Sequence, residues 1–210
     1  NKKITCLNLA ICFAACFTAF RLFSRLRGAR GEAQGKIFTW GSLKSERSLE
    51  WLTSEAARPL LAAATVHVVP NMNPDGTRRG NTRTNAKGAN LNREWESPTM
   101  ERSPEVFLVR KLMSETGVDY YLDAHVWSGT HVFALGPYNV PSITNRQVEL
   151  WQRYEKALAT ANPDFEVGWK YPGGGPAPGK ADTKMSWNWI SEQGCFGVLY
   201  ELLYKDNRNL

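Results

Sequence analysis

Two groups of side chains in the sequence have the types and spacing that chemistry requires. His125 and Glu201 each end a run of apolar residues, while Arg83, Asn92 and Arg93 lie in one long polar segment. An imidazole can bind a metal ion, a carboxylate can accept a proton, and a planar guanidinium can bind a carboxylate through paired N–H groups. Each residue taken alone is also typical of an ordinary solvated position, so the case for chemistry depends on their combination.

The apolar patterning predicts the elements that position these residues. β-branched and apolar runs predict strands at 65–69, 120–124, 131–135 and 196–201. Periodicity, caps and breakers predict helices at 43–64 with a break at Pro59, from Ser103 to the stop at Gly117, at 144–161, and at 182–193 with Asp182 as its cap. Alternating strands and helices indicate an α/β fold with helices on the faces of a sheet. His125 and Glu201 then stand at strand carboxyl ends, where such sheets place their functional groups.

Composition excludes several classes of protein. The 210 residues are 42% apolar and 22% charged, which suits one buried core and argues against a disordered chain or a coiled coil. The formal net charge of +6 is concentrated at one end, since residues 1–36 contain seven Lys or Arg and only Glu32 as an acid. The other residues balance, so no basic surface for nucleic acid is predicted.

Residues 4–20 form an apolar run that stands between two lysines and four arginines. This run is compatible with a short membrane anchor, with a secretion signal, or with a leader outside the fold, and membrane contact is expected only through it. Cys195 is the one cysteine beyond the run. No disulfide framework is therefore expected, and the predicted location is the cytoplasm, a reducing compartment.

Four sequence segments carry a resemblance to a known family. The polar segment contains NMNPDG at 71–76, then Arg83, and then ANLNREW at 89–95; LDAH follows at 122–125 and YE at 200–201. In this order they resemble the zinc metallocarboxypeptidases, specifically the cytosolic carboxypeptidase-like branch. The resemblance covers about residues 49–210. It implies an α/β fold with a mixed central β-sheet flanked by helices on both faces.

The resemblance also implies a role for each candidate residue. His125 is expected to bind Zn²⁺, and Glu201 to act as general base and then as general acid. Arg83 is expected to polarise the scissile carbonyl and stabilise the oxyanion, while Asn92 and Arg93 bind the free α-carboxylate of the substrate. The implied activity is hydrolysis of C-terminal residues from peptides or protein tails.

One motif of the family is missing. The family's first zinc motif is His-Pro-Gly-Glu, whereas this sequence has no histidine before His67 and offers Ala-Arg-Gly-Glu-Ala at 29–33. Glu32 is then the expected second metal ligand, and two protein ligands bind zinc weakly. His67 is expected to be structural, and His131 has no counterpart in the motif.

These departures leave two functions open. One is a zinc carboxypeptidase, and the other is an inactive carboxypeptidase-fold module that binds C-terminal carboxylates. Residues 1–28 are expected to be a leader, and residues 29–210 a catalytic domain whose N-terminal part is missing.

Overall fold

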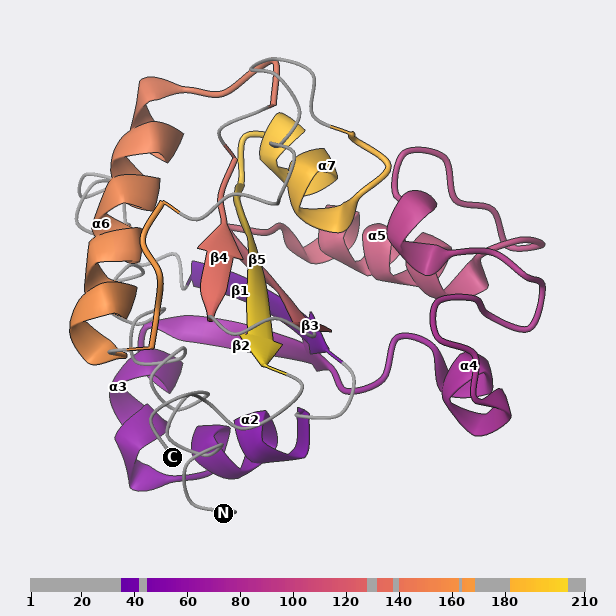
Figure 1. The fold of residues 1–210 in the computed structure, drawn as a ribbon, viewed down its shortest axis with the longest axis horizontal. Coiled ribbons are helices and arrows are strands. Elements are labelled where there is room, and N and C mark those ends of the chain that lie inside the picture. The colour runs from indigo at the N-terminus through magenta and orange to yellow at the C-terminus, as the bar shows by residue number, and fades with distance from the viewer. Residues whose placement is uncertain are drawn as a thin grey trace.

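The structure is a computed structural model that describes residues 35–41, 45–127, 132–137, 140–162, 164–168 and 182–203. Its described strands form one sheet in the order β2-β1-β3-β5-β4, shown in Figure 1. Their bounds are β1 Gly35–Gly41, β2 Ala64–Val69, β3 Tyr120–Trp127, β4 Phe133–Leu135 and β5 Phe196–Leu203. β2, β1, β3 and β5 run parallel to one another, and β4 is antiparallel to β5. The predicted mixed sheet is confirmed.

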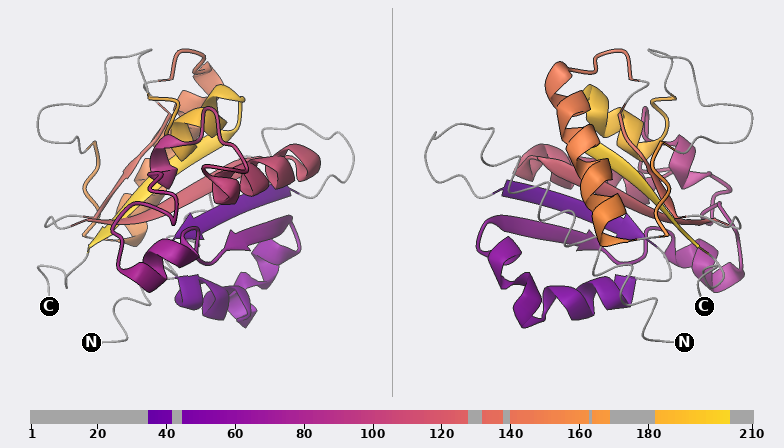
Figure 2. Two further views of the ribbon diagram at one scale, coloured as in Figure 1. Left: turned by 90° about the vertical axis from the view of Figure 1, so that its right-hand side faces the viewer. Right: turned by 60° about the vertical axis from the view of Figure 1, so that its left-hand side comes forward.

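Helices cover both faces of this sheet, as predicted. The described helices are α2 Ser45–Leu52, α3 Arg58–Leu61, α4 Pro74–Arg79, α5 Pro104–Thr116, α6 Asn145–Ala161 and α7 Ser186–Glu192, with 3-10 turns η1 Glu55–Ala57 and η2 Leu91–Arg93. Figure 2 shows α2 and α3 on the opposite side of the sheet from α5. In the described part of the chain, no helix combines the length and apolarity needed to cross a membrane. The apolar run at 4–20 lies outside the described residues.

Two hydrophobic cores follow from the alternation of side chains along the strands. Tyr120 and Leu122 of β3 join a core with residues from α2, α3 and α6. Tyr121, between them, points to the other face and joins a core with residues from α5 and α7. Asp123 and His125 share the parity of Tyr121, so the backbone directs them to the face that α7 covers.

Sequence signals at several helix ends are confirmed. α5 has Ser103 as its N-cap residue and ends at Gly117, whose φ of 79° suits a residue without a side chain. Thr144 forms a capping box with Gln147 at the start of α6. Pro59 lies in the first turn of α3, where the missing N–H is tolerated, so the predicted break falls just before it.

Two predictions need correction. The helix expected from Asp182 begins only at Ser186, because the Asp182 carboxylate accepts the N–H of Lys184 in a local turn instead of capping the helix. Strand β1 is absent from the predicted strands, although it lies inside the sheet between β2 and β3. Its sequence, GKIFTWG, has a glycine at each end and only a short apolar run, which is a weak strand signal.

Candidate active site

His125 and Glu201 lie opposite each other on adjacent parallel strands. They are register partners in the pairing of β3 with β5, and Nδ1 of His125 is 3.6 Å from Oε1 of Glu201. Both stand towards the carboxyl ends of their strands, as the sequence indicates. The Glu201 side chain is 6% exposed and that of His125 is 28% exposed, so the carboxylate is buried behind an imidazole that reaches solvent.

A third residue, Asp123, completes this cluster and was missed from the sequence. Its Oδ1 lies 2.9 Å from Nε2 of His125, and its Oδ2 accepts a hydrogen bond from the hydroxyl of Ser186 at the start of α7. Asp123 and Ser186 are both almost fully buried. The signal that could have found Asp123 is its place two residues before His125, on the same face of the strand.

The two carboxylates around His125 control its charge when no metal is bound. Burial lowers the pKa of His125, but attraction to Asp123 and Glu201 and hydrogen bonds to both outweigh burial and raise that pKa to about 10. Burial and the Asp123 carboxylate also raise the pKa of Tyr121. The metal-free site therefore holds a protonated imidazole at neutral pH, flanked by acceptors.

The Asn-Pro-Asp-Gly segment begins the long loop that carries the predicted carboxylate-binding residues. Asn73 caps α4 by accepting the N–H of Gly76 at 3.0 Å, and its Nδ2 donates to the carbonyl of Thr84 at 3.0 Å. A Cβ on Gly76 would lie against the Asn73 side chain and 2.6 Å from the Thr84 oxygen. Only glycine fits this close approach, which explains the motif locally.

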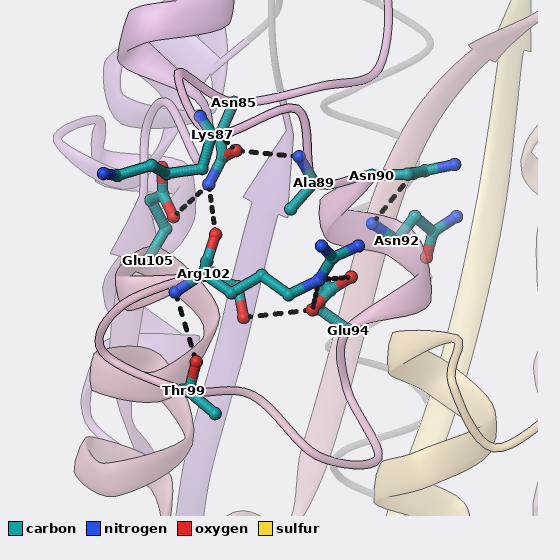
Figure 3. A network of polar contacts seen from close by, with 10 residues as sticks. Asn85, Lys87, Ala89, Asn90, Asn92, Glu94, Thr99, Arg102 and Glu105 are labelled. Carbon is teal, nitrogen blue, oxygen red and sulfur yellow. Dashed lines mark hydrogen bonds and ion pairs between the residues drawn. The ribbon is translucent and has the colours of Figure 1, made fainter.

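A network of asparagine side chains then shapes the rest of the loop (Figure 3). Asn85, which is 2% exposed, accepts the N–H groups of Lys87 and Ala89 and donates to Glu105 and to the carbonyl of Arg102. Local side-chain bonds of this kind replace the backbone ladder that the loop lacks.

Asn92 and Arg93 lie together in η2 at the end of this network. Asn90 caps the turn by accepting the N–H of Asn92 at 3.2 Å. Arg93 donates from Nη1 to the Asn92 carbonyl at 2.7 Å, and its Nε lies 3.7 Å from Oδ2 of Asp182. The Arg93 side chain is 37% exposed, so part of its guanidinium remains accessible to a ligand.

Arg83 joins neither the His125–Glu201 pair nor the Asn92–Arg93 turn through a hydrogen bond or ion pair in the described part of the chain. Its side chain is exposed, and among the described residues it makes no hydrogen bond or ion pair. Within the same residues, no hydrogen bond or ion pair connects Asn92 or Arg93 with His125 or Glu201. The structure therefore brings His125 and Glu201 together at one place, and Asn92 and Arg93 together at another.

The donor set around His125 fits one ligand position of a zinc site. Its Nε2 is held by a carboxylate, and its Nδ1 faces the side of Glu201, which is the arrangement that metal-bound histidines adopt. The described residues do not complete the site, because they contain no group of three His, Cys, Asp or Glu side chains placed to hold a metal ion.

Of the other candidate ligands, only His67 lies within the described residues, and it does not complete the site. Glu32 and His131 lie outside the described residues. His67 is on β2, which β1 separates from β3, and its register places it level with Tyr121 through Phe38. Two strand spacings are about 10 Å, so His67 cannot share a metal ion with His125. Burial and Lys36 lower the pKa of His67.

Sequence comparisons identify related proteins. Residues 48–209 match the zinc carboxypeptidase family. An uncharacterised protein of Zymomonas mobilis is 42% identical over 170 residues, which are 79% of this chain and 44% of that protein. Cytosolic carboxypeptidase 1 of Mus musculus is 37% identical over 68 residues, which are 31% of this chain and 6% of that protein.

Solved structures share the fold. A metallo-carboxypeptidase from Burkholderia cenocepacia is 34% identical with a TM-score of 0.73, over 86% of this chain and 50% of that one. A metallo-carboxypeptidase from Pseudomonas aeruginosa, in complex with (2-guanidinoethylmercapto)succinic acid, is 31% identical with a TM-score of 0.75, over 86% of this chain and 51% of that one. The chain thus spans about half the length of these relatives. Together with the shared fold, the match over residues 48–209 shows that the chain belongs to the zinc carboxypeptidase family.

Proposed function

We propose that this domain binds the C-terminal carboxylate of a peptide or protein tail and takes part in zinc-dependent removal of the terminal residue. The observation that carries the proposal is the register pairing of His125 with Glu201, which sets a buried carboxylate beside an imidazole. A carboxylate in this position can take a proton from an attacking water and return it to the leaving amine.

The loop residues support recognition of the chain end. The guanidinium of Arg93 is half-exposed and suits paired hydrogen bonds to a carboxylate. Asn92 lies beside Arg93 in the same turn, and an amide NH₂ group can donate hydrogen bonds to a carboxylate. Arg83, exposed and unpaired within the described chain, is proposed to meet the scissile carbonyl.

Zinc would be held in part by His125, with Glu32 as the further ligand that the sequence suggests. When bound in this family, zinc activates water and polarises a carbonyl. The residues of this chain bind the substrate carboxylate, move the proton at the Glu201 carboxylate, and keep the imidazole in place.

A second function is favoured by one observation, which is that the described residues supply a single imidazole at the site. The fold would then be a binding module that retains Asn92 and Arg93 but does not cleave. Both functions involve peptide C-termini, and neither involves nucleic acid.

The deciding experiment uses two peptides of identical sequence, one with a free C-terminal carboxylate and one with a C-terminal amide. Binding and cleavage are measured with and without added Zn²⁺. Preferential binding of the free carboxylate is expected, with a loss of about tenfold or more in Arg93→Gln, because a charge-assisted hydrogen bond contributes about 1.5–3 kcal/mol. Arg78→Gln removes an exposed arginine of α4 and is the matched control.

The outcomes separate the two functions. Zinc-dependent cleavage that Glu201→Gln abolishes supports the enzyme, while carboxylate binding without cleavage supports the module. Equal binding of the acid and the amide would contradict both. The cytoplasmic location and the separate status of residues 1–28 remain predictions from the sequence, which a fusion to a fluorescent protein with and without residues 1–28 would test.

A further inference from the structure

Asp123 belongs to a segment that carries the family resemblance but is given no function by it, and its carboxylate lies closer to the His125 imidazole than that of Glu201. Its Oδ1 is 2.9 Å from Nε2 of His125, whereas Glu201 is 3.6 Å from the other ring nitrogen. A carboxylate that is 1% exposed needs partners for both oxygens, because an unpaired buried charge is strongly unfavourable.

Ser186 supplies the second partner. Its hydroxyl donates to Oδ2 of Asp123, so each carboxylate oxygen has one donor. Ser186 is the first residue of α7, and α7 packs directly on β3 and β5. The carboxylate is therefore fixed from two sides, by its own strand and by the helix that covers this face.

A third contact restricts the ring from another direction. The ring of Trp187, the next residue of α7, lies edge-on to His125 with centroids 6.3 Å apart and an interplanar angle of 87°. Trp187 is itself buried. The imidazole thus has a neighbour that limits its tilt and an acceptor that selects one ring nitrogen.

We propose that Asp123, held by Ser186, is a positioning residue that accepts the Nε2–H group of His125 and thereby turns Nδ1 towards Glu201. The orientation of the imidazole is a property of the metal-free chain. Only its use in zinc-dependent hydrolysis rests on the proposed function. The contact with Asp123 directs Nδ1, and not Nε2, to the side of Glu201, in the manner of carboxylates that orient metal-binding histidines.

The test is the proton NMR signal of the His125 Nε2–H group in the metal-free full chain with ¹⁵N-labelled histidine. A hydrogen bond to a buried carboxylate shifts this proton to low field and slows its exchange with water. The protonated imidazole of the natural chain is expected to give a low-field resonance from each of its two N–H groups, both absent from His125→Gln, and the ¹⁵N label identifies the Nε2–H resonance that is followed here. Asp123→Ala should lose the resonance, and Asp123→Asn, which keeps a neutral acceptor, should retain it at higher field.

Asp119→Ala is the matched control, because Asp119 is also buried, precedes the same strand and accepts a backbone N–H of Lys36 at 2.8 Å. It should destabilise the fold and leave the resonance in place. If Asp123→Ala does not fold, Asp123→Asn and Ser186→Ala test the role of Asp123, because both are expected to move the resonance to higher field.

A resonance that keeps its position in these two variants would overturn the proposal, as would its absence from the folded natural chain. The peptide-binding experiment is independent of this signal. A chain that binds no peptide and retains the resonance contradicts the proposed function alone, and a chain that binds the free carboxylate without the resonance contradicts the role of Asp123 alone.

Discussion

The strand ends that carry His125 and Glu201 differ from the loop that carries Asn92 and Arg93 in how their geometry is set. The first pair is fixed by backbone register between strands far apart in the sequence, and Glu201 is buried. The loop residues are fixed by hydrogen bonds within a short stretch of chain, and they are partly exposed.

The two regions thus correspond to two proposed tasks, proton transfer at the strand ends and recognition of the substrate carboxylate in the loop. Register pairing positions an acid and an imidazole that come from distant parts of the sequence, and packing of α7 over them excludes solvent from the carboxylates. Local asparagine bonds shape a surface turn that can receive an external carboxylate. The two regions should therefore respond differently to pH, to cavities and to loss of side chains.

The largest effect is expected from raising the pH of the metal-free chain. The folded pKa of His125, about 10, lies above its ordinary value of 6.5, so the charged imidazole stabilises the fold fully below about pH 6.5, and this contribution is lost as the pH rises through about 10. One pKa unit corresponds to about 1.4 kcal/mol, so the loss should exceed that of any single hydrogen bond.

The measurement is urea unfolding with a chelator present, from pH 6 to pH 10.5, for the natural chain and for His125→Gln. The free energy of unfolding should fall more steeply in the natural chain. Parallel curves would show that Asp123 and Glu201 do not hold the proton on His125.

The second-largest effect is the loss of stability expected when Asn85→Ala removes the hydrogen bonds that shape the loop. The substitution leaves the N–H groups of Lys87 and Ala89 without their acceptor and removes two donated bonds, and each unsatisfied buried group costs about 1–3 kcal/mol. We expect a loss of about 3 kcal/mol in unfolding free energy and weaker binding of the free-carboxylate peptide. Asn81→Ala, whose side chain makes one exposed bond at 3.3 Å, should change stability little.

A smaller effect is expected from Gly197→Ala, which acts on the strand region instead. A Cβ at this position would lie against the carbonyl oxygen of Trp187 and 2.6 Å from Cγ2 of Ile190, so α7 must move away from β5. Overpacking of this kind costs about 1–3 kcal/mol. Unfolding free energy should fall by about 2 kcal/mol, and the low-field His125 signal should shift, while a chain with unchanged stability would contradict the close contact.

The sequence predicts where the strands lie better than it predicts which side chains meet across the sheet and its covering helix. β-branched runs located β2, β3 and β5, and the order of motifs implied that His125 and Glu201 act together. The contact with Asp123 and Ser186 could not be predicted, because Ser186 enters the site only through the packing of α7 on β3, a tertiary contact that local patterns do not encode.

The assignment of Glu32 illustrates the opposite limit. It rests on the comparison of residues 29–33 with the family's first zinc motif, and Glu32 lies outside the described residues. A local sequence pattern of this kind predicts a ligand without placing it in the fold. A zinc titration of Glu32→Gln against the natural chain would test the assignment.

The smallest effect on stability is expected from Arg102→Ala. Its Nε contacts both carboxylate oxygens of Glu94, at 3.0 and 3.1 Å, but the side chain is 60% exposed, and exposed ion pairs contribute about 0–1 kcal/mol. Unfolding free energy should fall by less than about 1 kcal/mol in urea titrations, and affinity for the free-carboxylate peptide should stay within about twofold of the natural chain, since less than 0.5 kcal/mol of binding energy is at stake.

The small expected effect of Arg102→Ala on peptide affinity is informative when it is compared with the larger effect expected of Arg93→Gln. Both arginines belong to the same loop region, but Arg102 already binds an internal carboxylate closely, whereas the ion pair of Arg93 within the described residues, with Asp182, is 3.7 Å long. An arginine without a close carboxylate partner can bind a ligand carboxylate without first breaking a strong ion pair. If Arg102→Ala weakened peptide binding as much as Arg93→Gln, carboxylate recognition would depend on the summed charge of the loop, and the specific role of the Arg93 guanidinium would be wrong.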